Sequence, residues 1–139
     1  DLYRKGDVAG SRAFFEEAVK YSPRDPVARI ELAQSMEEQD PEGAQAQYRK
    51  AVELHPANAP ARSRLGILLA QGGRREEALT QFREAARLMP YDESIQFNCG
   101  LALLSNGQKD EAVERFRTAL DINPDFSPAR KQLERIHPP

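Results

Sequence analysis

The residue types that carry out catalysis or bind metal are sparse in this sequence, and their spacing favours neither role. His55 and His137 lie far apart, and neither belongs to an H-x-x-x-H pair, the spacing that lets two imidazoles on one helical face share a zinc ion. Cys99 is the only cysteine, so neither an intrachain disulfide nor a cysteine zinc site can form. These residues predict no metal site, and we expect His55, beside Pro56, to have a structural role in a turn.

Two further patterns resemble chemical motifs but lack the residues that the chemistry needs. The run QGGRRE, residues 71–76, is rich in glycine but lacks the Gly-Lys-Ser/Thr ending of a phosphate-binding loop, so it predicts the end of a helix. The acidic pairs Glu76-Glu77 and Asp110-Glu111 fall in the first turns of predicted helices, where negative charge complements the helix dipole. We therefore predict that the chain is not an enzyme and that it binds no cofactor and no metal.

Composition restricts the classes of protein further. The chain has 139 residues, of which 40% are hydrophobic and 30% charged, which is typical of a folded protein. Its formal net charge of −2 argues against nucleic-acid binding, which normally needs a concentrated basic surplus. No apolar run approaches the roughly 18 residues of a membrane span, so we expect no insertion into a membrane.

The elements that position the side chains recur at a fixed period. Four prolines, Pro23, Pro56, Pro90 and Pro124, are separated by 33, 34 and 34 residues. The prolines are preceded by a small residue, an aromatic residue four positions later and a second small residue three positions after that. This spacing places all three on one face of an α-helix. The sets are Phe15 with Ala18; Ala44, Tyr48 and Ala51; Ala78, Phe82 and Ala85; and Ala112, Phe116 and Ala119.

Each period holds two predicted helices, an A helix followed by a B helix that carries the aromatic residue. The predicted ranges are a helix remnant at 1–5 and helices at 7–21, 26–38, 41–54, 59–71, 75–88, 93–105, 109–121 and 127–136. The pairs Asp25-Pro26, Asp40-Pro41 and Ser127-Pro128 each predict a capping side chain followed by proline at the first helical position. Gly72-Gly73 and Asn106-Gly107 predict helix ends, because both pairs tolerate the left-handed backbone conformation.

Small residues in the A helices predict close contact within each helix pair. Ala33, Gly66 and Gly100 fall at the same phase of successive A helices. Glycine inside a helix costs up to about 1 kcal/mol relative to alanine, so Gly66 and Gly100 indicate that the two helices need close backbone approach. We expect these residues to lie opposite Ala44, Ala78 and Ala112 of the following B helices.

A 34-residue period of two helices, with Leu-Gly in helix A and then Gly, Ala, an aromatic residue, Ala and a final Pro, resembles the tetratricopeptide repeat. The resemblance implies an all-α, right-handed α-solenoid of helix-turn-helix repeats. It divides 1–139 into a partial repeat at 1–25, repeats at 26–58, 59–92 and 93–126, and a capping helix at 127–136. The repeat at 26–58 lacks one residue in its inner turn, EEQDPEG, where we expect a tighter turn and a local change of pitch.

The resemblance also implies a concave groove lined by the A helices. Its predicted partner-binding residues are Ile30, Arg64, Ile67, Phe97, Asn98, Leu101, Leu104 and Lys131. The groove would grade from acidic at Glu31 and Glu37, through an apolar middle, to basic at Lys131 and Arg135. Some family members hold the C-terminal carboxylate of chaperone partners in a basic clamp, but Ser63, Ile67, Pro128 and Gln132 stand at clamp positions here, so we do not expect that activity.

The resemblance favours a non-catalytic scaffold that binds a partner peptide or helix in this groove. We expect Phe97→Ala or Leu101→Glu to abolish partner binding while helicity is retained. Neighbouring A helices, a terminal segment or a second copy could instead cover the apolar middle, and exposed terminal repeats could self-associate. One alternative is a recruiting arm of a larger enzyme such as a glycosyltransferase or sulfotransferase. A second is RNA binding through Arg62, Arg64, Arg130 and Arg135, which steeply salt-dependent binding would favour.

Overall fold

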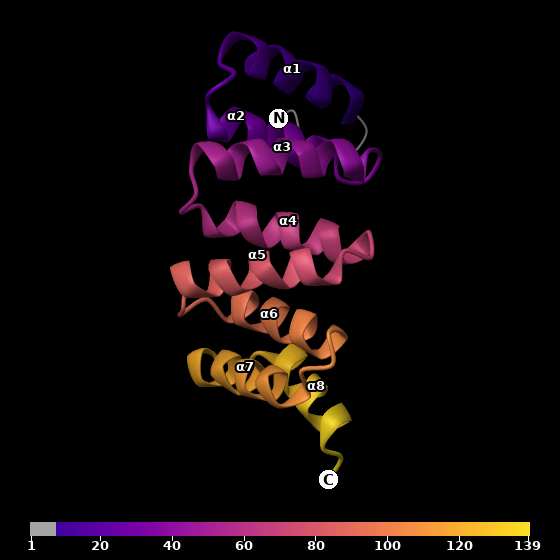
Figure 1. The fold of residues 1–139 in the computed structure, drawn as a ribbon, viewed down its shortest axis with the longest axis vertical. Helices are drawn as coiled ribbons and strands as arrows, with labels where there is room; N and C mark the ends of the chain where they lie inside the picture. The colour runs from indigo at the N-terminus through magenta and orange to yellow at the C-terminus, as the bar shows by residue number, and fades with distance from the viewer. Residues whose placement is uncertain (1–7) are drawn as a thin grey trace.

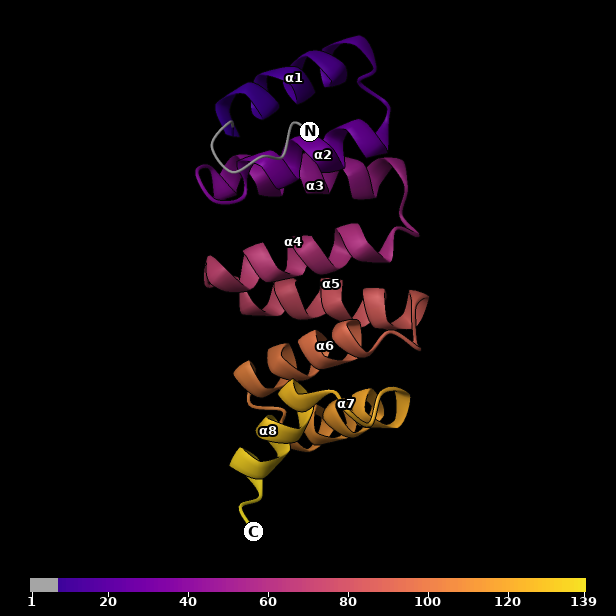
Figure 2. The same cartoon turned by 180° about the vertical axis from the view of Figure 1, so that it is seen from behind.

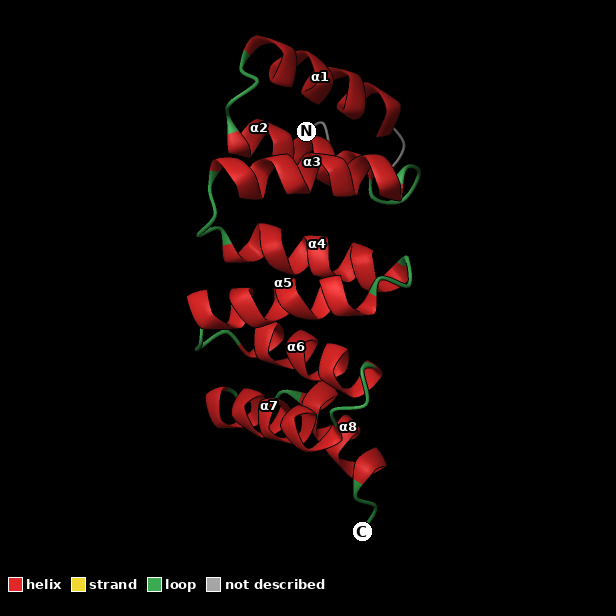
Figure 3. Cartoon of the chain, in the orientation of Figure 1, coloured by secondary structure: helices red, strands yellow, loops and turns green. Residues whose placement is uncertain are grey.

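The computed structural model describes residues 8–139, which form eight α-helices and contain no strand (Figure 3). In order they are α1 (Val8–Tyr21), α2 (Pro26–Met36), α3 (Pro41–Leu54), α4 (Ala59–Gln71), α5 (Arg75–Leu88), α6 (Glu93–Ser105), α7 (Lys109–Ile122) and α8 (Ser127–Ile136). The predicted helix remnant at 1–5 lies outside the described residues.

The helices stack along one axis, from α1 at one end of the molecule to α8 at the other (Figures 1 and 2). Each helix contacts the helix that follows it in sequence, and α4 also contacts α6. Such nearest-neighbour packing is the architecture of a solenoid. The molecule is therefore an all-α solenoid of helical repeats, in which α2, α4, α6 and α8 are the predicted A helices.

The inner turn of the shortened repeat differs from the prediction. We expected a tighter turn, but helix α2 has 11 residues where α4 and α6 have 13, and four residues, 37–40, join it to α3. Gly73 and Gly107 adopt positive φ values of 80° and 78° in the turns after α4 and α6. The segment 37–40 has no glycine for that conformation. Here the helix ends at Met36, and the backbone N–H of Asp40 bonds to the carbonyl of Met36 at 2.7 Å.

Side-chain caps begin most of the A helices. Asp25 accepts a bond from the Val27 N–H at 2.9 Å, and Asn58 and Asp92 play the same part for α4 and α6. The prediction for α8 was wrong: Ser127 is already helical and Phe126 holds the cap position without a side-chain bond. Proline at the second helical position tolerates this shift, because the backbone N–H there needs no partner within the helix.

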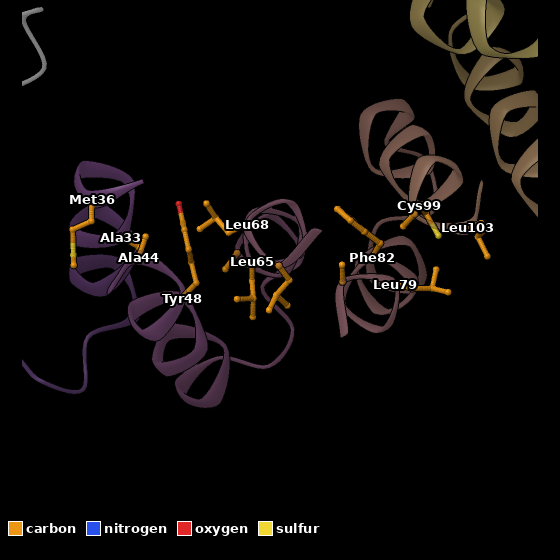
Figure 4. Close-up of a cluster of buried hydrophobic side chains, with 14 of the residues drawn as sticks. Ala33, Met36, Ala44, Tyr48, Leu65, Leu68, Leu79, Phe82, Cys99 and Leu103 are labelled. Atoms are coloured by element: carbon orange, nitrogen blue, oxygen red, sulfur yellow. The ribbon is translucent and has the colours of Figure 1, made fainter. Parts of the chain in front are cut away.

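A continuous apolar core runs through the stack, and within it two glycines lie close against aromatic rings. Figure 4 shows Tyr48 of α3 facing Leu65 and Leu68 of α4. A Cβ added at Gly66 would lie 2.9 Å from the Phe82 ring, and one at Gly100 would lie 2.6 Å from the Phe116 ring. The glycines therefore make room for the aromatic ring of the B helix, one turn beyond the alanines that we expected opposite them.

Candidate functional site: the groove along the A helices

One apolar hollow lies between α4, α5 and α6, and we call it the α4–α6 pocket. It has a volume of about 400 Å³ and brings together three of the predicted groove residues, Ile67, Asn98 and Leu101. Its complete lining is Ile67, Ala70, Gln71, Arg75, Ala78, Phe82, Asn98, Leu101, Ala102, Ser105 and Asn106. Ile67 and Leu101, two of the apolar residues predicted for the groove, line this hollow.

Small side chains leave this space open. Ala70, Ala78 and Ala102 project only a methyl group each, so the ring of Phe82 forms part of the lining although it is almost fully buried. The side chain of Asn98 supplies an amide donor and acceptor to the same lining. An apolar hollow with a few polar groups is suited to hold an apolar side chain and to orient the chain that carries it.

A second hollow lies one repeat nearer the N-terminus, between α2, α3 and α4, and we call it the α2–α4 pocket. It has a volume of about 530 Å³ and is lined by Glu37, Glu38, Pro41, Arg64, Ile67, Leu68, Gln71 and Gly72. It shares Ile67 and Gln71 with the α4–α6 pocket, so the two hollows are adjacent along the A helices.

An ion pair occupies the α2–α4 pocket. The guanidinium of Arg64 donates to both carboxylate oxygens of Glu37, at 2.5 Å and 3.1 Å. The hydroxyl of Tyr48 donates to the same carboxylate. Burial raises the pKa of the Tyr48 phenol, and the hydrogen bond to Glu37 raises that pKa further. Glu37 is therefore held by two partners, and its charge at the predicted acidic end of the groove is compensated.

The other predicted groove residues fall outside these two pockets. Phe97 and Lys131 line a third hollow against α8, of about 620 Å³. The Phe97 ring also lies 5.6 Å from the Phe116 ring and 5.5 Å from the Phe126 ring, so it packs between α7 and the segment before α8. Ile30 and Leu104 are half-buried against the core and line none of the three hollows.

The packing of Phe97 changes the value of one proposed substitution. Phe97→Ala would remove ring contacts that join α6, α7 and α8, so a loss of binding in that variant would not separate recognition from packing. Leu101 and Ala70 line the α4–α6 pocket without this aromatic contact. Substitutions there test the groove more directly.

Three arginines considered for RNA contacts have partners within the chain. Arg62 donates to the Pro56 carbonyl at 2.8 Å and to the Gln81 side chain at 2.9 Å. Arg130 donates to the Pro124 carbonyl, and Arg64 is paired with Glu37. Sequence reasoning missed these bonds, although the same interval of six residues separates Arg62 from Pro56 and Arg130 from Pro124 and was a usable signal.

The described residues offer little for catalysis. Within residues 8–139 no group of three or more His, Cys, Asp or Glu side chains is placed to hold a metal ion. Cys99 is buried, and burial raises the pKa of its thiol, which disfavours the reactive thiolate. In the same part of the chain, no helix is long and apolar enough to cross a membrane.

Fold and groove together define a helical-repeat protein, and comparison with known families identifies which kind. Tetratricopeptide-repeat models match residues 35–90 and 94–126, which together make up more than half of the chain. The chain belongs to the tetratricopeptide-repeat family. Proteins of this family are generally non-catalytic interaction modules.

A curated relative shares part of the sequence. The cellulose synthase operon protein C of Xanthomonas axonopodis pv. citri (strain 306) is 36% identical over 74 residues, which are 53% of this chain. The match spans only 5% of the length of that relative. It therefore supports the presence of related repeats and leaves the activity of the longer protein outside the comparison.

Solved structures share the fold over most of the chain. A crystal structure of MamA superposes with a TM-score of 0.86 at 24% identity, covering 92% of this chain and 75% of MamA. A MamA structure from Desulfovibrio magneticus RS-1 gives 0.89 at 20% identity, covering 97% and 77%. YrrB, a TPR protein with an unusual peptide-binding site, gives 0.82 at 25% identity, covering 91% and 66%.

Proposed function

We propose that this chain is a non-catalytic scaffold that binds a segment of a partner protein in its concave groove. The segment places an aliphatic or aromatic side chain in the α4–α6 pocket, against Ile67 and Leu101, and Asn98 bonds to its backbone. The repeat boundaries proposed from the sequence, 26–58, 59–92 and 93–126, assign this pocket to the junction of the last two full repeats.

The observation that carries the proposal is the apolar lining of the α4–α6 pocket, which includes the ring of Phe82. Burying one aliphatic or aromatic side chain gains roughly 1.5–3 kcal/mol. A micromolar dissociation constant corresponds to about 8 kcal/mol after association costs, so the anchor needs additional contacts along the groove. The adjacent α2–α4 pocket, with Arg64 and Gln71, offers them.

Membership of the tetratricopeptide-repeat family and the likeness to the peptide-binding protein YrrB support this proposal. The second candidate, a recruiting arm of a larger protein, has one supporting observation. The curated relative is far longer than this chain, so related repeats do occur within large proteins. Both candidates use the same groove, and they differ in what is attached to it.

Selection of peptides from a random library tests the proposal directly. A phage-displayed library of random linear peptides is selected against the immobilised chain, and enriched peptides are then titrated against purified variants. Leu101→Glu and Ala70→Glu each place a carboxylate in the pocket. Ala70 is exposed, so its replacement leaves the core intact. Met89→Glu is the matched control, because Met89 is an exposed apolar residue outside the three hollows.

We expect the enriched peptides to share an apolar residue and to lose affinity about tenfold or more with either pocket variant, which corresponds to 1.4 kcal/mol. Met89→Glu should bind like the wild type. Peptides that bind all variants equally, or no enrichment at all, would contradict the proposal. A concentration-dependent dimer that Leu101→Glu converts to a monomer in sedimentation would identify a second copy as the occupant and would also overturn it.

A further inference from the structure

The two adjacent pockets lie at the same place in two successive repeats. Moving along the chain by one repeat converts the lining of the α2–α4 pocket into that of the α4–α6 pocket. The corresponding pairs are Glu37 and Ala70, Glu38 and Gln71, Pro41 and Arg75, Arg64 and Asn98, Ile67 and Leu101, Leu68 and Ala102, Gln71 and Ser105, and Gly72 and Asn106. The solenoid therefore offers the same hollow twice, with different side chains.

Three linked positions separate the polar pocket from the apolar one. In the first, the carboxylate of Glu37 accepts bonds from the Tyr48 hydroxyl and the Arg64 guanidinium. The corresponding residues in the second are Ala70, Phe82 and Asn98. The aromatic residue, Tyr48, bears a hydroxyl in the repeat where the Glu37 carboxylate accepts its hydrogen bond. In the next repeat the aromatic residue, Phe82, has no hydroxyl. Ala70 replaces the carboxylate there, and the Phe82 ring lines the hollow.

We propose that this three-residue difference selects the partner segment. The segment carries a single apolar anchor, which enters the α4–α6 pocket. One repeat nearer the N-terminus it carries a hydrogen-bond acceptor, which faces Arg64. This inference rests on the proposed function of the groove and adds its specificity. We call the set of Glu37, Tyr48 and Arg64 closed to apolar side chains, although its hollow is the larger of the two, about 530 Å³ against about 400 Å³, and we call the set of Ala70, Phe82 and Asn98 open to them.

The solvent exposure of Arg64 and Glu37 determines which groups of a partner can bind in the closed pocket. The side chain of Arg64 is 48% exposed and that of Glu37 is 18% exposed, so the guanidinium is the charge that faces the groove. An apolar side chain placed over this pair would remove water from two charges without giving them a new partner, which is unfavourable. A carboxylate, amide or carbonyl oxygen of the partner bonds to Arg64 instead.

The open pocket has the opposite character. Its lining contains no acidic side chain, and its one ionised residue, Arg75, has no hydrogen bond or ion pair from its guanidinium to any described residue. A partner therefore meets apolar surface flanked by a free positive charge. Basic residues beside the anchor are disfavoured there by repulsion.

Exchanging the two sets provides matched variants. The opened variant, Glu37→Ala with Tyr48→Phe and Arg64→Asn, gives the α2–α4 pocket the composition of the α4–α6 pocket. The closed variant, Ala70→Glu with Phe82→Tyr and Asn98→Arg, does the reverse. Both variants use side chains that the same fold already holds one repeat away, and circular dichroism melting curves check that each is folded.

Each protein is used to select peptides from the same random phage-displayed library. We expect the wild type to enrich peptides with one required apolar residue. The opened variant should enrich peptides with two apolar residues at a fixed spacing, and alanine at either should weaken binding about tenfold or more. The closed variant should lose the single-anchor peptides. If the closed variant does not fold, the inference is still tested by whether peptides selected with the opened variant need a second apolar residue.

The inference is overturned if wild-type peptides already need two apolar residues, or if the opened variant selects the same sequences as the wild type. Both results would leave the proposed function standing, provided that Leu101→Glu still abolishes binding. Absence of any selected peptide, or binding that Leu101→Glu does not change, would overturn the proposed function and the inference together.

Discussion

Single contacts between a small residue and an aromatic ring set the distance between the helices of each pair. At Gly100 an added Cβ would lie 2.6 Å from the Cε1 atom of Phe116, whose side chain is fully buried. The ring is enclosed by neighbouring residues, so it has little freedom to move away. Glycine is therefore required here by packing, despite its cost to the helix.

Gly100→Ala tests this contact. Overpacking in a core costs roughly 1–3 kcal/mol, while alanine gains up to about 1 kcal/mol in helix propensity, so we expect a net loss of about 1–2 kcal/mol. The measurement is the shift of the urea unfolding midpoint. Phe116→Leu combined with Gly100→Ala should lose less than the two single changes added together, because the shorter side chain makes room. Simple additivity would mean that the ring is not the obstacle.

The Tyr48 hydroxyl predicts a stability change at alkaline pH. Its pKa is raised in the folded chain by burial and by the bond to Glu37, whereas an unfolded tyrosine titrates near pH 10, at a pKa of about 10. Below that pH both states hold the proton. As the pH rises through about 10 only the unfolded state releases it, so the free energy of unfolding falls. The urea midpoint of Tyr48→Phe should fall less than that of the wild type between about pH 9 and about pH 11. Parallel pH profiles for the two proteins would refute the role of Tyr48.

At this scale the sequence predicted contacts between side chains of different helices less well than it predicted which residues share one face of a helix. Ile67, Asn98 and Leu101 were predicted to share a surface, and they do, because helical spacing within one repeat carries over to the next. The pairing of Glu37 with Tyr48 and Arg64 was missed. It joins three helices, and the exact spacing of side chains between helices depends on packing that no single-helix pattern contains.

Whole helices are fixed to each other by a bond that recurs in every repeat. The fourth residue of each A helix donates to the carbonyl of the proline six positions earlier. The pairs are Arg29 with Pro23, Arg62 with Pro56, Gln96 with Pro90 and Arg130 with Pro124. The same residue also reaches the following B helix, in the pairs Arg29 with Gln47, Arg62 with Gln81 and Gln96 with Arg115. These bonds hold the start of an A helix, the preceding turn and the next B helix together.

In one repeat the arginine and the glutamine that join the A helix to the B helix exchange places. This exchange predicts that swapping the two residues in another repeat preserves stability. Arginine donates to glutamine in the pair of Arg62 and Gln81, but Arg115 of the B helix donates to Gln96 of the A helix at 3.1 Å. Arg62→Gln combined with Gln81→Arg should therefore keep the wild-type stability. Arg62→Ala should lose about 1–2 kcal/mol, since a part-buried hydrogen bond contributes about 1 kcal/mol. Urea unfolding measures the stability of both variants. A double variant as unstable as Arg62→Ala would show that the bond does not contribute to stability.

Helix boundaries were the most predictable feature of the chain. Proline and capping residues act locally, so α3, α4, α5, α6 and α8 begin and end at the predicted residues. The differences arose where no local signal decides between two structures. Helix α2 ends at Met36, two residues before its predicted end, and α7 continues one residue past its predicted end to Ile122. The range of α8 is as predicted, but its cap is Phe126 and not Ser127.

At the scale of the molecule, nearest-neighbour stacking produces a groove whose character changes from one repeat to the next. An ion pair lines it between α2 and α4, and mainly apolar side chains line it between α4 and α6. The family resemblance predicted a groove with an apolar middle and left open that other parts of the chain cover that middle. Phe97 packs in this way, with its ring against those of Phe116 and Phe126. Residue type alone does not distinguish an aromatic ring that recognises a partner from one that closes the end of the stack.

The most direct test of the central claim is a map of the bound position by methyl NMR. The chain, labelled at its isoleucine, leucine and valine methyl groups, is titrated with a peptide selected by phage display. We expect the signals of Ile67 and Leu101 to shift and that of Val113, buried on a B helix, to stay in place. Shifts confined to the B helices, with Ile67 and Leu101 unchanged, would contradict the account.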